Sequence, residues 1–523
     1  MRRTRSIGVV LIAAALAACG VNPVTGKKEI QFVSESQEIQ IGRQHYAPTR
    51  QSQGGDFVLM PELTAYVSEV GQKLAAVAER PLPYEFVVLN SSVPNAWALP
   101  GGKIAVNRGL LTTLENEAEL AAVLGHEIVH AAARHGAQAQ ERGTLLQVGM
   151  VAASIGVAMS DVDPGLGNLM VQGAGVGAQL ISMRYGREAE LESDHYGMRY
   201  LARVGYDPAA AVTLQEKFLA LSQQDGRSRG WLEGLFASHP PSEERVERNR
   251  ATAAGLGSGG ELGAERYARA LAPLRAVQPA YEQHDQAIAA ARKKDFATAR
   301  RLAQSAAEAV PREARFQQLL GDLAMAEKQP ARALPYYEKA VSLDPGYFGA
   351  YLGGGIAAYE AGDRAKAESW LRQSTELLPT APAMYYLGSI AKDAGNVDRA
   401  LEYYRAAAGS NSALGKRATG EYAALDVGRN PANYVATAAA VDAQGRVILR
   451  VQNRAPIALA DVTVTPVRVD AAGRILQQGN PIRLRGALEP GQQAALDAGI
   501  GVIPAEQLPY IRFRVDGARA ASR

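Results

Sequence analysis

The stretch Gly125-His126-Glu127-Ile128-Val129-His130 lies within a run of helical periodicity from about 116 to 134. In a helix, His126 and His130 are one turn apart on the same face, where two imidazoles can bind one zinc ion. Glu127 lies beside them and can accept a proton from a water molecule on that metal. The stretch therefore predicts a zinc hydrolase, in which His126 and His130 are metal ligands and Glu127 is the catalytic base.

The third ligand of such a site must come from another part of the chain. The chain has one cysteine, so neither an internal disulfide nor a cysteine-based zinc site can form. A metzincin would have a histidine six residues after the second ligand, but that residue is Gly136, and His135 is one position early. We therefore interpret His135 as an ordinary polar residue and expect the third ligand farther along the chain.

Two pairs of acidic residues open the next candidate helix, REAELESD at 187–194. Glu190 and Asp194 are four residues apart on one face, so one carboxylate could bind the metal while the other orients a ligand histidine. By spacing alone, Glu188 and Glu192 form an equally good pair, and a solvated acidic face is a further alternative. The spacing leaves these alternatives open.

The length of 523 residues predicts two to four domains, and the net charge of +3 provides no broad positive field to attract nucleic acid. Around the histidine stretch, the runs 84–90 and 95–106 are typical of strands, with a turn at 100–102, and helical periodicity fills the rest. The sequence GLGSGGELG at 255–263 is typical of a loop. We predict an α+β zinc metallopeptidase domain over 56–254 and a linker over 255–280.

The region after this loop repeats with a period of about 34 residues. Alanine, proline and glycine recur in one common phase, at Ala299, Ala333, Ala367 and Ala400, at Pro311, Pro345 and Pro379, and at Gly321, Gly355 and Gly388. This period, with small residues where two helices touch, resembles tetratricopeptide repeats. We therefore predict an all-α solenoid over 281–414, whose concave face binds peptides or partner proteins.

The last part of the chain changes to a two-residue alternation. Strand-like runs occur at 447–452, 462–465, 467–469 and 511–515, with turns at 443–445 and 471–473. We predict an all-β sandwich over 430–523.

The N-terminus, MRRTRSIGVVLIAAALAAC, combines three arginines with an apolar run that ends at Cys19. The run is too short for a membrane-spanning helix, so we predict a signal peptide over 1–18. Leu16-Ala17-Ala18-Cys19 resembles a bacterial lipobox, which implies acylation of Cys19 and a lipidated tether over 19–55. Gly20 stands where a retained lipoprotein has Asp, which favours the outer membrane, facing the periplasm.

HEIVH followed about sixty residues later by EAELESD resembles the gluzincin-type metallopeptidases of the HtpX and CaaX-prenyl-endopeptidase superfamily, and among them the periplasmic BepA-like lipoprotein branch with C-terminal tetratricopeptide repeats. In that family the third ligand is the first Glu of a Glu-x-x-x-Asp motif that follows an Arg-containing turn. Tyr185-Gly-Arg187, Glu190 and Asp194 match this motif. The resemblance thus implies Glu190 as the third zinc ligand and Asp194 as the residue that orients a ligand histidine.

The segment Ser238-His239-Pro240-Pro241 also matches the family. The resemblance implies that the His239 imidazole reaches the zinc site, where it could stabilise the oxyanion in catalysis or occupy the fourth position in a latent state. The segment 144–183 is rich in Gly, Ala and Val, which fits a packed helical pair, a lid over the site or a contact with the bilayer surface.

We therefore expect a one-zinc endopeptidase of the bacterial cell envelope that cleaves unfolded or misassembled envelope proteins. Its repeats would recruit substrates or the outer-membrane assembly machinery. The alternative is a latent protease that acts through its repeats as a chaperone or assembly adaptor. Intact ligands and Glu127 favour the enzyme.

Overall fold

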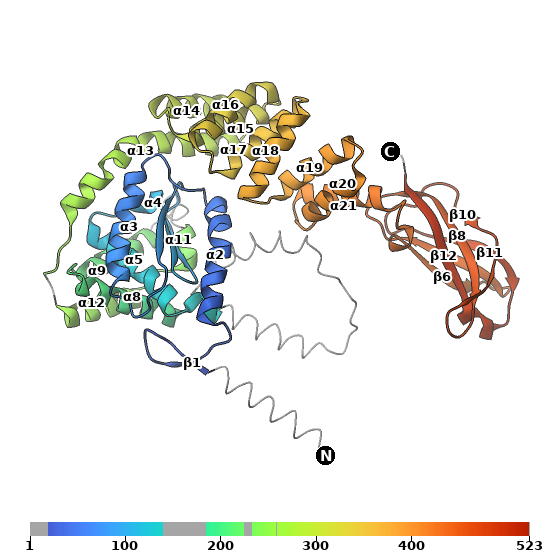
Figure 1. Ribbon diagram of the computed structural model, residues 1–523, viewed down its shortest axis with the longest axis horizontal. Coiled ribbons are helices and arrows are strands. Elements are labelled where there is room, and N and C mark those ends of the chain that lie inside the picture. Colours follow the sequence, from blue (N-terminus) through green and yellow to red (C-terminus); the bar gives the residue numbers. More distant parts are fainter. Residues whose placement is uncertain (1–18, 140–184, 224–232, 258, 522–523) are drawn as a thin grey trace, which may run out of the picture. The chain divides into compact units, whose positions relative to one another are not determined.

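The computed structural model describes residues 19–139, 185–223, 233–257 and 259–521 (Figure 1). The predicted signal peptide and the segment 144–183 lie outside the described residues. The chain forms two compact units, one with the described residues up to Leu378 and one from Pro379 onward. In the part of the chain that the structure describes, no helix combines the length and the apolar character needed to cross a bilayer.

The first unit begins with a small hairpin and a long helix. Strand β1 (Cys19–Val21) pairs antiparallel with β2 (Lys28–Ile30), and α2 (Glu35–Ser52) follows. Ser34 and Gln37 form a reciprocal capping box that fixes the start of α2. The ring of Tyr46 in α2 packs edge-on against Trp97, with centroids 6.3 Å apart. The predicted tether over 19–55 thus contains ordered structure that packs on the domain.

A three-stranded sheet in the order β3-β5-β4 forms the β part of this unit. Strand β3 (Glu85–Leu89) runs parallel to β5 (Lys103–Asn107), and β4 (Ala96–Leu99) runs antiparallel to it. Gly101 and Gly102 turn the chain between β4 and β5 at φ values of 77° and 82°, which suit glycine. The predicted strands and their turn are confirmed.

The sheet and several helices surround α5 (Glu117–Ala132), which carries the histidine stretch and is buried along its whole length. Its neighbours include α3 (Pro61–Ala75), α8 (Arg187–Arg203) and α9 (Ala209–Ser222), and α12 (Glu243–Leu256) covers α8 and α9. Helices α5 and α8 approach closely at Gly125 and Gly197, where an added Cβ on Gly197 would lie 3.0 Å from the backbone nitrogen of His126. Glycine at this crossing therefore lets the acidic residues of α8 face the histidines of α5.

Helix α13 (Ala264–Arg292) continues from this domain into the repeats. Tyr267, Leu271 and Leu274 have no exposed surface and belong to the same hydrophobic core as α5, and the Tyr267 hydroxyl donates to the carbonyl of Leu111. Residues 264–280, which lie in the predicted linker, are therefore the first half of a helix that completes the core. The glycine-rich sequence at 255–263 correctly predicted the end of α12. It gave no information about α13, whose apolar residues recur at helical spacing and pack into the core.

From α13 onward, helices that are consecutive in the chain pack against each other in pairs. Their bounds are α14 (Phe296–Ala309), α15 (Ala314–Ala326), α16 (Pro330–Leu343), α17 (Phe348–Glu360) and α18 (Arg364–Leu377) in the first unit, and α19 (Ala381–Asp393), α20 (Val397–Ala408) and α21 (Ala413–Asp426) in the second. The phased glycines lie where paired helices touch, because an added Cβ at Gly321 would clash with Tyr337 and one at Gly355 with Leu371. The predicted helical repeat is confirmed.

The second unit ends in two antiparallel sheets. One has the order β10-β8-β12 with β9 also on β8, and the other has the order β11-β7-β6. The strands are β6 (Val435–Val441), β7 (Arg446–Asn453), β8 (Leu459–Val469), β9 (Ile475–Gln478), β10 (Ile482–Arg483), β11 (Gln493–Val502) and β12 (Ile511–Ala520). Side chains of both sheets share one core, which confirms the all-β prediction. The runs predicted at 462–465 and 467–469 are one strand, β8. Strands β6, β9, β10 and β11 were not predicted, because β9 and β10 are short, β6 is rich in alanine and β11 is rich in alanine and glycine, residues that are depleted in strands.

Candidate metal centre

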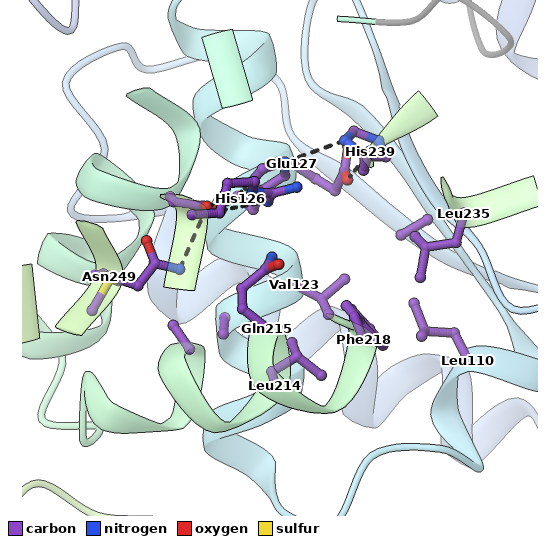
Figure 2. Close-up of a pocket in the computed structure, with 16 residues that line it drawn as sticks. Leu110, Val123, His126, Glu127, Leu214, Gln215, Phe218, Leu235, His239 and Asn249 are labelled. Atoms are coloured by element: carbon purple, nitrogen blue, oxygen red, sulfur yellow. Dashed lines mark hydrogen bonds and ion pairs between the residues drawn. The ribbon is translucent and has the colours of Figure 1, made fainter. Parts of the chain in front are cut away.

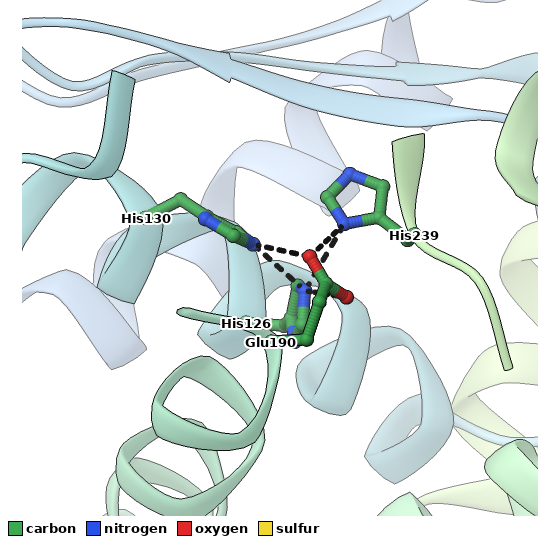
Figure 3. A group of neighbouring side chains, drawn as sticks. All are labelled: His126, His130, Glu190 and His239. Carbon is green, nitrogen blue, oxygen red and sulfur yellow. Dashed lines mark hydrogen bonds and ion pairs between the residues drawn. The ribbon is translucent and has the colours of Figure 1, made fainter. Parts of the chain in front are cut away.

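Helices α5 and α8 bring three of the predicted metal ligands together (Figure 3). The Nε2 atoms of His126 and His130 are 2.9 Å apart. The carboxylate of Glu190 lies 3.4 Å from His130 Nε2 and 3.6 Å from His126 Nε2. All three residues are buried, so their polar atoms face one another rather than solvent.

His239 adds a fourth side chain to this group. It follows α11 (Glu233–Ser238), and its Nδ1 lies 3.1 Å from Glu190 Oε1 and 3.3 Å from His126 Nε2. One donor atom from each of these four residues lies within 4.8 Å of the others. Three imidazole nitrogens and one carboxylate oxygen are a donor set that suits zinc. The residues present therefore fit a metal ion.

The protonation states of two ligands also suit metal binding. Burial lowers the pKa of His130 well below its usual value, which keeps the imidazole neutral. Burial alone would raise the pKa of Glu190, but the neighbouring histidines, above all His239, outweigh it and hold the pKa well below its usual value. A neutral imidazole and an ionised carboxylate are the forms that bind a metal.

Asp194 lies next to this group and contacts the Nδ1 atom of His126, not the Nε2 atom that faces the other ligands. The Nδ1 of His126 donates to Asp194 Oδ1 at 2.8 Å, which leaves Nε2 free to face Glu190. Arg245 of α12 donates two hydrogen bonds of 2.7 Å to the Asp194 carboxylate and also lies 2.8 Å from Glu190 Oε2. Asn249 donates to the same carboxylate at 3.4 Å. Asp194 thus occupies the position expected of the orienting residue.

Glu127 lies next to the Nε2 atom of His239, whereas Glu190 lies next to its Nδ1 atom. The Oε1 of Glu127 is 3.6 Å from His239 Nε2, and its Oε2 has no hydrogen-bond partner among the residues that the structure describes. Burial raises the pKa of Glu127, although His239 and His126 oppose the shift. A carboxylate with a raised pKa and a free oxygen is suited to accept a proton at neutral pH.

An apolar cavity opens beside Glu127 and His126 (Figure 2). It is about 50 Å³ in volume. Its apolar lining comes from several segments and includes Leu110, Val123, Leu214, Phe218 and Leu235. An apolar side chain of a bound polypeptide would gain free energy by entering this space.

The structure also shows contacts that the sequence did not suggest. His135, interpreted above as an ordinary polar residue, is buried, and its Nδ1 lies 2.9 Å from His130 Nδ1. Glu192 contacts His135, with its Oε1 3.2 Å from His135 Nε2, and Glu188 is exposed. Neither member of the alternative acidic pair is therefore in the metal-ligand group. The five-residue spacing of His130 and His135 was the available signal.

Residues 61–253 match the model of Peptidase family M48. These residues are an M48 peptidase domain. Three further models, all of the tetratricopeptide repeat, match residues 284–348, 324–390 and 381–413. The recognition of a metallopeptidase domain followed by tetratricopeptide repeats is thus confirmed.

Two curated relatives are each about one third identical to this chain over the residues that align. The beta-barrel assembly-enhancing protease of Escherichia coli (strain K12) is 32% identical over 236 residues, which are 44% of this chain and 47% of the relative. The mitochondrial metalloendopeptidase OMA1 of Schizosaccharomyces pombe (strain 972 / ATCC 24843) is 32% identical over 232 residues, 43% of this chain and 64% of the relative. The matched region thus spans about half the length of the bacterial relative.

Among solved structures, the crystal structure of MamA protein is 24% identical, covers 29% of this chain and 84% of its own, and has a TM-score of 0.26.

Proposed function

We propose that the protein is a zinc-dependent endopeptidase of the bacterial cell envelope. The observation that carries this proposal is the convergence of one donor atom each from His126, His130, Glu190 and His239 within 4.8 Å. Beside them lies Glu127 Oε2, which has no hydrogen-bond partner among the described residues. The names of both curated relatives, a protease and a metalloendopeptidase, support the same reaction class.

In this mechanism His126, His130 and Glu190 hold the zinc ion. When bound, the ion supplies Lewis-acid polarisation of the scissile carbonyl and lowers the pKa of water. Glu127 accepts the proton of the attacking water at its free Oε2, since no other described group competes for that atom. Asp194 keeps the His126 ring oriented throughout.

The proposed substrates are unfolded or misassembled envelope proteins. An extended chain can add to the edge of a sheet, and β4 is the edge strand next to the site. The repeats would recruit substrates or the outer-membrane assembly machinery, in line with the name of the Escherichia coli relative. The lipobox-like sequence supports an outer-membrane anchor at Cys19, facing the periplasm.

A second function is favoured by His239. Its Nδ1 lies as close to Glu190 and His126 as a fourth ligand would, so it could close the position that a substrate needs. The protein would then be a latent protease that acts through its repeats as a chaperone or assembly adaptor. The catalytic role for His239, stabilisation of the oxyanion, is the opposite alternative.

The experiment compares purified wild-type protein with Glu127→Gln and His239→Ala, using zinc analysis and hydrolysis of an unfolded outer-membrane protein. Glu127→Gln should keep zinc and lose roughly 10²–10⁴-fold in hydrolysis, because the amide cannot accept the proton. A rise in hydrolysis on His239→Ala supports latency, and a fall supports oxyanion stabilisation. Unchanged hydrolysis by Glu127→Gln would contradict the mechanism.

A further inference from the structure

The turn of the N-terminal hairpin is built around Asn22. Its Oδ1 accepts hydrogen bonds from the backbone nitrogens of Val24, at 2.9 Å, and Thr25, at 3.1 Å, and its carbonyl accepts from Gly26. These two donors define which end of the amide is oxygen, so the Nδ2 of Asn22 must point the other way. The hairpin therefore presents an oriented hydrogen-bond donor to the body of the domain.

That donor reaches α8 and the end of α5. The Nδ2 of Asn22 donates to Glu192 Oε1 at 3.1 Å and to the carbonyl of Ala133 at 3.4 Å. Asn22 is 4% exposed, although it lies three residues from the predicted lipid-bearing Cys19. A buried amide without hydrogen-bond partners would cost free energy of folding, so these two hydrogen bonds stabilise the position of the hairpin on the domain.

Glu192, which accepts the hydrogen bond from Asn22, also contacts His135. Its Oε1 lies 3.2 Å from His135 Nε2, and a carboxylate can only accept, so His135 Nε2 carries the proton. A neutral His135 then has an unprotonated Nδ1. That atom lies 2.9 Å from His130 Nδ1 and 3.4 Å from Ser193 Oγ, so in this tautomer of His135 the nearer contact is made with His130 Nδ1 as the donor.

This order of donors fixes the tautomer of His130. With its proton on Nδ1, the Nε2 of His130 has a free lone pair, and that atom faces His126 and Glu190. The ring of Tyr185 stacks on His130 with centroids 3.9 Å apart, which limits tilting of the imidazole. The contacts of His130 thus have the same effect as the Asp194 contact of His126: a partner at Nδ1 leaves Nε2 free to bind a metal ion.

We propose that the N-terminal hairpin is part of the metal centre, with Asn22, Glu192 and His135 as positioning residues that fix the tautomer and orientation of His130. The proposal rests on the proposed metal-binding function. It makes the segment after Cys19 more than a tether, because loss of the hairpin contact weakens a metal ligand at the far end of the series. Outer contacts of this kind change metal affinity by about 10–100-fold.

The test uses the full chain and four substitutions. Asn22→Asp keeps an acceptor for Val24 and Thr25 but replaces the donor to Glu192 by a second carboxylate oxygen. Glu192→Leu removes the acceptor, whereas Glu192→Gln retains one oxygen for His135 and should restore function. Glu188→Leu is the matched control, since Glu188 is an exposed acidic residue on the same helix.

Two measurements are made on each variant, with thermal unfolding as the check on folding. Zinc affinity is measured by chelator competition. The tautomer of His130 is read in metal-free protein from the ¹⁵N shifts of the seven histidines in selectively labelled chain. Asn22→Asp and Glu192→Leu should lower zinc affinity by about 10–100-fold and change the His130 tautomer signal, while Glu192→Gln and Glu188→Leu should resemble wild type.

The outcomes separate this proposal from the proposed function. If wild type binds zinc and the folded Asn22→Asp and Glu192→Leu variants bind it equally well, the positioning series is wrong and the peptidase proposal stands. If wild type binds no zinc, the peptidase proposal fails, and the His130 signal in metal-free protein still tests the series. An unchanged signal in folded Glu192→Leu overturns it.

Discussion

Arg245→Met should destabilise the protein strongly, because Arg245 neutralises two buried carboxylates. The side chains of Arg245, Asp194 and Glu190 are 5%, 6% and 3% exposed. Removal of one partner from a buried ion pair leaves an uncompensated charge and typically costs about 3–5 kcal/mol. At about 2–4 °C per kcal/mol for a cooperative unit of 150–250 residues, the melting temperature should fall by roughly 6–20 °C.

The chain offers a matched control for this change. Arg187 and Glu244 form another ion pair between α8 and α12, but their side chains are 66% and 30% exposed. Exposed pairs contribute only about 0–1 kcal/mol, so Arg187→Met should hardly change the melting temperature. Calorimetry of both full-length variants with a chelator present measures the difference. Equal shifts in the two variants would refute the idea that burial sets the cost.

The buried pair of Arg245 and Asp194 also predicts how the stability of the protein depends on pH. Burial alone would raise the pKa of Asp194, but Arg245 and His126 outweigh it and lower the pKa below its usual value. Such a carboxylate contributes stability above its unfolded pKa of about 3.9 and loses it as the pH falls through the lower folded pKa. The stability difference between wild type and Arg245→Met should therefore be full at neutral pH and shrink below about pH 4. A difference that grows in acid would contradict this sign.

Three further predictions concern other parts of the chain. Glu190→Ala should reduce zinc occupancy of the purified protein far more than Glu188→Ala, because only Glu190 lies among the ligand atoms, and the reverse order would show that the helix faces are misassigned. Leu271→Ala should destabilise the peptidase domain by about 2–5 kcal/mol in denaturant unfolding, because this side chain of α13 is fully buried in the core. A loss below about 0.5 kcal/mol, as expected of a surface site, would exclude a contribution of α13 to the core. Cys19→Ser should release the protein from outer-membrane fractions, because its thiol is the only candidate lipid acceptor at the lipobox, and a variant that still fractionates with the membrane would contradict the anchor.

Features that depend on neighbouring positions along the chain could be predicted from the sequence. The four-residue spacing of His126 and His130 places both on one helix face, and the 34-residue phase of glycine and alanine marks helix contacts. The turn at Gly101 and Gly102 follows from the conformations that glycine permits. Each of these patterns is set by local geometry, so no knowledge of distant contacts is needed.

Features that depend on which faces meet could not be predicted in this way. Glu190 and Glu192 belong to pairs with the same spacing, and only the close crossing at Gly125 and Gly197 decides which of them faces the histidines of α5. The partner of His135 is likewise invisible in the sequence, because Glu192 lies 57 residues away. Family resemblance supplied the choice of Glu190, for which spacing alone offers no physical reason.

The charges around the candidate site explain why so many separate segments meet there. Glu127, Glu190 and Asp194 carry three negative charges when ionised, and Arg245 supplies one positive charge, so a divalent ion balances the group when His239 is neutral. Buried charges are stable only when they are paired, which makes metal binding and folding of this region favour each other. Because α5, α8 and α12 each contribute charged residues to this group, the balance exists only after all three helices have packed. Selection for a metal site here is therefore also selection for the contacts, including the Gly125 and Gly197 crossing, that hold these helices together.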